Sequence, residues 1–100
     1  MTEPLPDLET SELDEAALDA LFEDLASGAE ILELRVKAAP QTRVGTHTIP
    51  LAEAHARLVA RTVLGIQVRW VRGDDACMDT LLVTPTGVRL VRMHIPPDAP

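Results

Sequence analysis

Three segments of alternating apolar and polar residues occupy the last third of the chain, and they constrain its fold more than any other feature. They cover residues 66–72, 78–84 and 88–95, and the short stretches between them contain Gly, Asp and Pro residues typical of turns. Alternation with a period of two places every second side chain on the same face of a strand. The sequence therefore predicts three antiparallel strands that follow one another as a meander.

A helix and a fourth strand are predicted nearer the start of the chain. Residues 12–27 have apolar side chains at helical spacing, with Ser11 placed as the N-cap and Gly28 as the C-cap. Residues 31–37 then alternate, which predicts a half-buried strand. Its buried side chains are expected to be Leu32, Leu34 and Val36.

A second helix is predicted to start near Pro50, which suits the first turn of a helix, and to close at Gly65. The fold class is therefore α+β, with the order α-β-α-β-β-β and two helices packed on a four-stranded sheet. We expect a disordered lead-in over residues 1–10, one domain over 11–95 and a disordered tail over 96–100.

The turn lengths predict the register of the meander. A four-residue turn over residues 73–76 pairs Trp70 with Asp79, and a three-residue turn over 85–87 pairs Thr80 with Arg92. Trp70 then lies in the core, with Asp79 available as an acceptor for its indole N–H. The face expected to meet the helices carries Ile66, Val68, Trp70, Leu81, Val83, Val91 and Met93, with Asp79 and Arg89 near its ends.

The opposite face is predicted to mix apolar and charged side chains. In this register Arg69, Thr80 and Arg92 form a line across three strands. A face of this composition indicates either a protein interface or a surface covered by another element of the same chain. The candidate binding residues are Arg69, Thr80, Arg92, Met78, Leu82 and Leu90.

The charges are divided unevenly along the chain. The net charge is −7 at pH 7, yet all nine Lys and Arg residues lie after residue 34. Residues 1–34 are therefore acidic, and residues 35–100 are mildly basic. The line of arginines is expected to receive an acidic surface, either of a foreign protein or of the first helix of a second copy.

No linear pattern identifies an active site, a metal site or a cofactor site. Cys77 is the only cysteine, so no internal disulfide is possible, and a cytoplasmic setting is expected. Acidic neighbours disfavour the Cys77 thiolate, which makes a nucleophile paired with His94 a weaker interpretation than a structural cysteine. His47, His55 and His94 are too widely spaced for a linear metal motif, although a site assembled in space stays open.

The leading hypothesis is a small, non-catalytic accessory or adaptor protein that acts by protein–protein contact through the sheet face, as a homodimer or with a foreign partner. No apolar stretch approaches the ~20 residues that a membrane helix requires, so no membrane contact is expected. An enzyme with a spatially assembled site is a third class, for which no residue stands out. The alternative is a regulator that binds nucleic acid or another anion, against which the overall acidity argues. Its arginines and lysine would be Arg35, Lys37, Arg69, Arg89 and Arg92.

Overall fold

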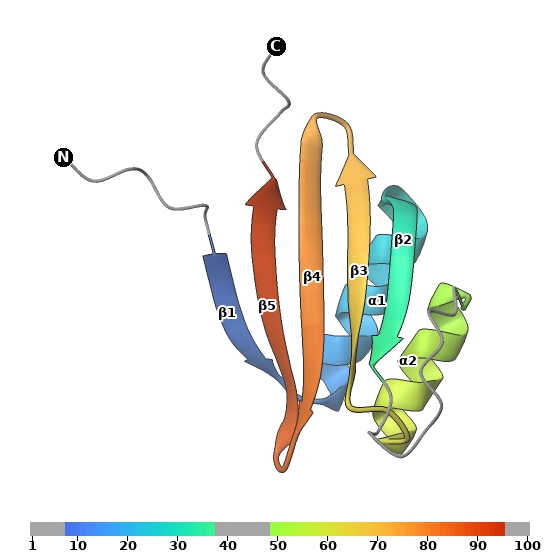
Figure 1. Ribbon diagram of the computed structural model, residues 1–100, viewed down its shortest axis with the longest axis vertical. Coiled ribbons are helices and arrows are strands. Elements are labelled where there is room, and N and C mark those ends of the chain that lie inside the picture. Colours follow the sequence, from blue (N-terminus) through green and yellow to red (C-terminus); the bar gives the residue numbers. More distant parts are fainter. Residues whose placement is uncertain (1–7, 38–48, 96–100) are drawn as a thin grey trace, which may run out of the picture.

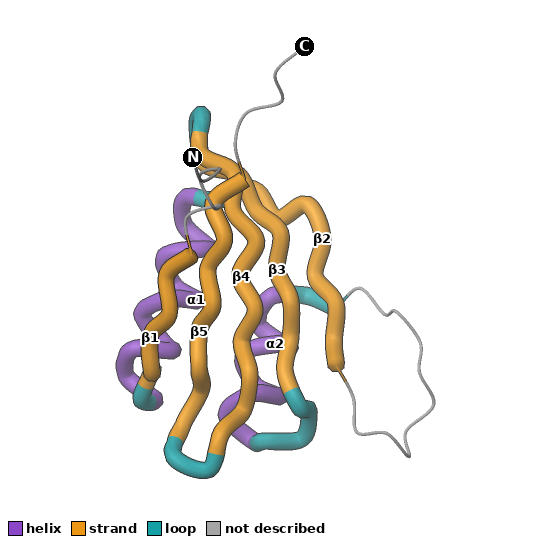
Figure 2. Tube along the Cα trace, turned by 60° about the vertical axis from the view of Figure 1, so that its left-hand side comes forward, coloured by secondary structure: helices purple, strands orange, loops and turns teal. Residues whose placement is uncertain are grey.

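The alternating segments form strands and the segments with helical spacing form helices in the computed structural model, which describes residues 8–37 and 49–95. Five strands make one antiparallel sheet in the order β1-β5-β4-β3-β2, and both helices lie on one face of it (Figures 1 and 2). The predicted α+β class is confirmed, but the predicted four-stranded sheet is wrong. The elements are β1 (Leu8–Leu13), α1 (Glu15–Gly28), β2 (Glu30–Lys37), α2 (Leu51–Ala60), β3 (Gly65–Arg72), β4 (Asp75–Thr84) and β5 (Gly87–Ile95).

Strand β1 is the fifth strand, and it lies where the sequence predicted the end of a disordered lead-in and the start of a helix. It pairs only with β5, from Leu8 opposite Met93 to Leu13 opposite Val88. As an edge strand it is exposed over most of its length, so its sequence shows no apolar alternation from which a strand could be predicted. The other parts of the predicted lead-in and tail, 1–7 and 96–100, lie outside the described residues.

Both helices begin and end at residues other than those predicted. Helix α1 starts after Asp14, whose carboxylate accepts a hydrogen bond of 2.8 Å from the backbone N–H of Ala17, and so Ser11 belongs to β1 rather than to a cap. Helix α2 ends before Arg61, which adopts a left-handed conformation with φ of 59°. Gly65, predicted to close this helix, is the first residue of β3.

The turn between β3 and β4 is shorter than predicted. It contains two residues, 73–74, and Gly73 has a φ of 57°, as the first central position of a type II′ hairpin turn requires. Trp70 consequently lies opposite Cys77, and Asp79 lies opposite Val68. Because the register differs from the predicted one by two residues, every side chain of β4 still points to its predicted face.

The turn between β4 and β5 is also shorter than predicted, and here the faces change. Thr84 pairs with Gly87 across two turn residues, and Asp79, rather than Thr80, lies opposite Arg92. This shift of one residue turns every side chain of β5 to the other face. Val91 and Met93, predicted to be buried, therefore lie on the face without helices, while Val88, Leu90, Arg92 and His94 lie on the helix-facing side.

Strand β2 contains a bulge that changes which of its side chains is buried. Ile31 pairs with Trp70 and Glu33 with Arg69, so Leu32 is the extra residue between two consecutive pairs. Leu32, predicted to face the core, is 52% exposed, and Ile31 packs against the core in its place.

The hydrophobic core lies between the sheet and the two helices. Trp70 is 5% exposed, which confirms its predicted burial. Among the described residues, neither helix is long and apolar enough to cross a lipid bilayer. The buried apolar side chains are Leu18, Phe22, Leu25, Leu34, Ala54, Leu58, Val63, Ile66, Val68, Trp70, Cys77, Leu81, Val88 and Leu90.

We predict that Gly87→Ala destabilises the protein because β1 and β5 approach each other closely at this residue. A Cβ atom on residue 87 would lie 2.7 Å from the carbonyl oxygen of Leu13, so the backbone would have to move. The expected cost is about 1–3 kcal/mol of unfolding free energy, measured by urea denaturation. Thr86→Ala, at the exposed neighbouring turn residue, is the control and should change stability by less than about 0.5 kcal/mol. Equal stability of the two variants would contradict the prediction.

Candidate protein interface

The face of the sheet opposite the helices is the candidate functional surface; we call it the outer face. No described element covers it, as Figures 1 and 2 show. Because directly paired residues of an antiparallel sheet share a face, the register identifies its side chains. Its apolar side chains, partly or largely exposed, are Leu8, Val71, Ala76, Met78, Leu82, Val91, Met93 and Ile95.

Charged side chains of both signs border these apolar residues. At the β1 end, Glu12 accepts a hydrogen bond of 2.6 Å from Nε of Arg89. At the β2 end, Glu33 accepts one of 2.8 Å from Nε of Arg35. Arg69 is exposed on the same face and has no ion pair among the described residues. The apolar side chains of the outer face therefore gather toward the end of the sheet at the β3–β4 turn, while Thr10, Thr80 and Gln67 flank Val91 across its middle. The charges on the face nearly cancel.

The structure brings together four of the six predicted binding residues. Arg69, Thr80, Met78 and Leu82 lie on the outer face, where Thr80 accepts a hydrogen bond of 3.2 Å from the Gln67 side chain. Leu90 and Arg92 lie on the helix-facing side because of the shift in β5. The predicted line of Arg69, Thr80 and Arg92 therefore does not form.

Arg92 belongs to a buried polar cluster on the helix-facing side of the sheet. The Asp79 side chain, 0% exposed, accepts bonds of 2.8 Å and 2.9 Å from Nε and Nη2 of Arg92. It also accepts one of 3.0 Å from the indole Nε1 of Trp70, which confirms the predicted Trp70–Asp79 contact. The Arg92 guanidinium lies 5.1 Å from the centre of the Trp70 ring. The hydrogen bond to Asp79 raises the pKa of Arg92.

Next to this cluster, a cysteine, a histidine and a carboxylate from three strands form a chain of contacts. Sγ of Cys77 lies 3.4 Å from Nδ1 of His94, and Nε2 of His94 contacts the carboxylate of Glu9. Cys77 is only 1% exposed, and burial raises the pKa of its thiol. A nucleophile needs an accessible thiolate, and both observations disfavour one. The arrangement supports a structural cysteine, which is how the sequence was interpreted.

The described residues contain no group of three or more His, Cys, Asp or Glu side chains that could hold a metal ion. Comparison with family models, with curated proteins and with solved structures finds no match to this chain. The chemistry of the surface is therefore the basis on which a function is proposed.

Removal of the buried carboxylate should be costly. We predict that Asp79→Ala lowers the free energy of unfolding by about 3–5 kcal/mol, because the Arg92 charge and the Trp70 N–H lose their partner in a buried position. Asp75→Ala, at the exposed start of the same strand, is the control and should cost less than about 0.5 kcal/mol. A second change, Arg92→Met, should recover part of the loss because no charge then lies unpaired. A small effect of Asp79→Ala, similar to that of Asp75→Ala, would contradict the interpretation.

The attachment of β1 should weaken in acid. The hydrogen bond to His94, and then the positive charges of His94 and Arg92, lower the pKa of Glu9 from its usual value of 4.5. The unfolded chain therefore binds this proton at a higher pH than the folded chain does. The stabilisation is complete above about pH 4.5 and is lost as the pH falls through the lower pKa of the folded state.

The measurement is the unfolding free energy of the native protein and of Glu9→Gln as a function of pH. The difference between the two should be nearly constant between about pH 5 and pH 6 and should shrink below about pH 4. Hydrogen exchange at the backbone amides of β1 should accelerate over the same range in the native protein. A difference that does not change with pH would exclude Glu9 as the cause.

Proposed function

We propose that this protein is a non-catalytic adaptor that acts by protein–protein contact, and that its outer face joins two copies of the chain. The observation that carries the proposal is the absence, among the described elements, of any cover over the apolar side chains of that face. Exposed apolar surface of this kind is costly in water and is typical of interfaces. A cytoplasmic setting is part of the same proposal.

The distribution of charge favours a second copy as the occupant of the outer face. The charges of this face nearly cancel, so two such faces can approach without strong repulsion; the charged side chains are Arg35, Lys37, Arg69, Arg89, Glu12, Glu30 and Glu33. When the same face of two copies meets, the contact has two-fold symmetry and the assembly is limited to a dimer. Contact of one copy's acidic helix with another copy's sheet would instead build a ring or an open chain.

The alternative of an anion-binding regulator receives little support from the geometry. Arg92 is held by Asp79 on the helix-facing side, Arg89 is paired with Glu12, and Arg35 is paired with Glu33. Phosphate recognition needs cations that converge on a common site. Of the five candidate cations, Arg69 and Lys37 have no acidic partner among the described residues, and they are four residues apart along the pairing of β2 with β3.

We predict that the native protein is a dimer and that Val91→Glu makes it monomeric, because the variant places an unpaired charge in the middle of the outer face. The measurement is sedimentation equilibrium over a range of concentrations, with circular dichroism to verify the fold. Val59→Glu is the matched control, since Val59 is 43% exposed and lies on α2, in the layer on the other side of the sheet. This control should remain dimeric. A native protein that is monomeric at millimolar concentration would refute the dimer.

A further inference from the structure

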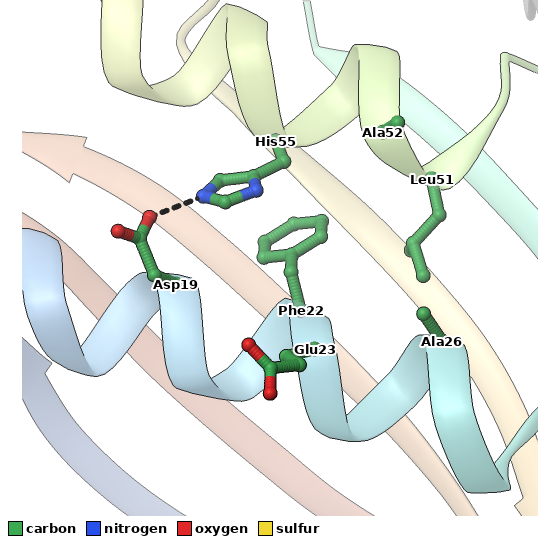
Figure 3. A pocket seen from close by; sticks show the side chains of 7 residues that line it. All are labelled: Asp19, Phe22, Glu23, Ala26, Leu51, Ala52 and His55. Atoms are coloured by element: carbon green, nitrogen blue, oxygen red, sulfur yellow. Dashed lines mark hydrogen bonds and ion pairs between the residues drawn. The ribbon is translucent and has the colours of Figure 1, made fainter.

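A groove between the two helices lies on the opposite side of the molecule from the outer face. It has a volume of about 290 Å³ and an apolar lining broken by the side chains of one histidine and two acids. This volume is near the lower end of the range for ligand pockets, about 300–1,000 Å³, and suits one long side chain better than a cofactor. The lining residues, seen in Figure 3, are Asp19, Phe22, Glu23, Ala26, Leu51, Ala52 and His55.

Two stacked rings form the centre of the groove. The Phe22 and His55 rings lie 4.6 Å apart, centre to centre, with an angle of 10° between their planes. Nε2 of His55 lies 2.6 Å from Oδ1 of Asp19, which fixes the imidazole ring in this position (Figure 3). Phe22 is buried, so the stack is anchored in the core and is formed before any ligand arrives.

The rim of the groove is negative. Asp19 and Glu23 lie one turn apart on α1, and both are exposed. Helix α1 contains no basic residue, and the arginine on α2, Arg57, is paired with Glu53. Asp19 contacts His55, whereas Glu23 has no ion pair among the described residues. The rim therefore offers a carboxylate to a cation that enters the groove.

We propose that this groove binds a basic amphipathic helix of a partner protein, with one arginine of that helix over the His55 ring, which is stacked on the buried Phe22, and between the carboxylates of Asp19 and Glu23. A guanidinium stacks on aromatic rings and donates paired hydrogen bonds to carboxylates, while its methylene stem packs against apolar residues such as Leu51. The proposal extends the adaptor function by naming the partner's chemistry. The groove is formed within one chain, so binding does not depend on the dimer.

The probe is a fluorescein-labelled synthetic peptide with Leu on one helical face and Arg on the other, titrated with the full chain and followed by anisotropy. The same peptide with Glu in place of Arg tests the sign of the charge. The Arg peptide should bind saturably and should shift the amide and ring signals of Phe22 and His55 in NMR spectra. The Glu peptide should not bind.

The double variant Asp19→Asn with Glu23→Gln keeps the shape of the groove and removes its charge. It should weaken binding of the Arg peptide about tenfold, the factor expected when two partly exposed ion pairs are lost. Its effect on stability should be small, because the like-charge contact on α1 and the exposed ion pair of Asp19 with His55 are lost together. Glu12→Gln with Glu33→Gln is the matched control; it changes the net charge equally but lies on the outer face, and should leave binding unchanged within twofold.

Ala26→Leu fills the groove without altering any charge, and it should also weaken the Arg peptide about tenfold. Weakening by the charge variant alone would show a general attraction to an acidic surface and would overturn the groove as the site. Equal binding of the Arg and Glu peptides, or no saturable binding, would overturn the proposal entirely. Val91→Glu should bind the Arg peptide as the native chain does, so failure of the dimer and failure of the groove are measured separately.

Discussion

The carboxylate of Asp79 decides how the three central strands align. Its partners come from both neighbouring strands, Trp70 from β3 and Arg92 from β5, so one buried group fixes two registers. Strand β5 has apolar residues on both faces, and its hydrophobic pattern alone permits either orientation. A slip of one residue in β5 would carry Arg92 to the outer face and leave the buried carboxylate with only the Trp70 N–H as a partner, which is costly. Electrostatics therefore selects the register where hydrophobicity does not.

This choice of register gives the two surfaces of the molecule their different characters. With Arg92 turned toward the helices, the outer face of β5 presents Val91 and Met93, and Met93 lies beside Met78 of β4. On the other side, α1 displays acids without bases. The proposed self-association and the proposed basic partner thus use opposite sides of one two-layered structure, and neither excludes the other.

Much of the fold could be predicted from the sequence, and the failures have specific physical causes. The burial of Trp70 and its contact with Asp79 were predictable because a long alternating strand determines its own faces. Gly87 was interpreted as a turn residue, whereas its role is to admit the Leu13 carbonyl of a strand that shows no pattern of its own. Because Gly87 was counted in the turn, the predicted β4–β5 turn was one residue too long, and Leu90 and Arg92 were assigned to the wrong face. The groove depends on how two helices pack, as in the Phe22–His55 stack, and the sequence holds no local signal for that.

The pairing of β1 with β5 has a consequence for folding kinetics. Glu9 and His94, which join these strands, are 85 residues apart, whereas β3, β4 and β5 are joined by two-residue turns. Closing so long a loop costs entropy that only a nearly complete structure repays, so β1 should be among the last elements to dock. Until it does, β5 has an unpaired backbone edge, and unpaired edges promote aggregation. During folding, the polar strand β1 therefore covers the backbone edge of β5 only at a late stage.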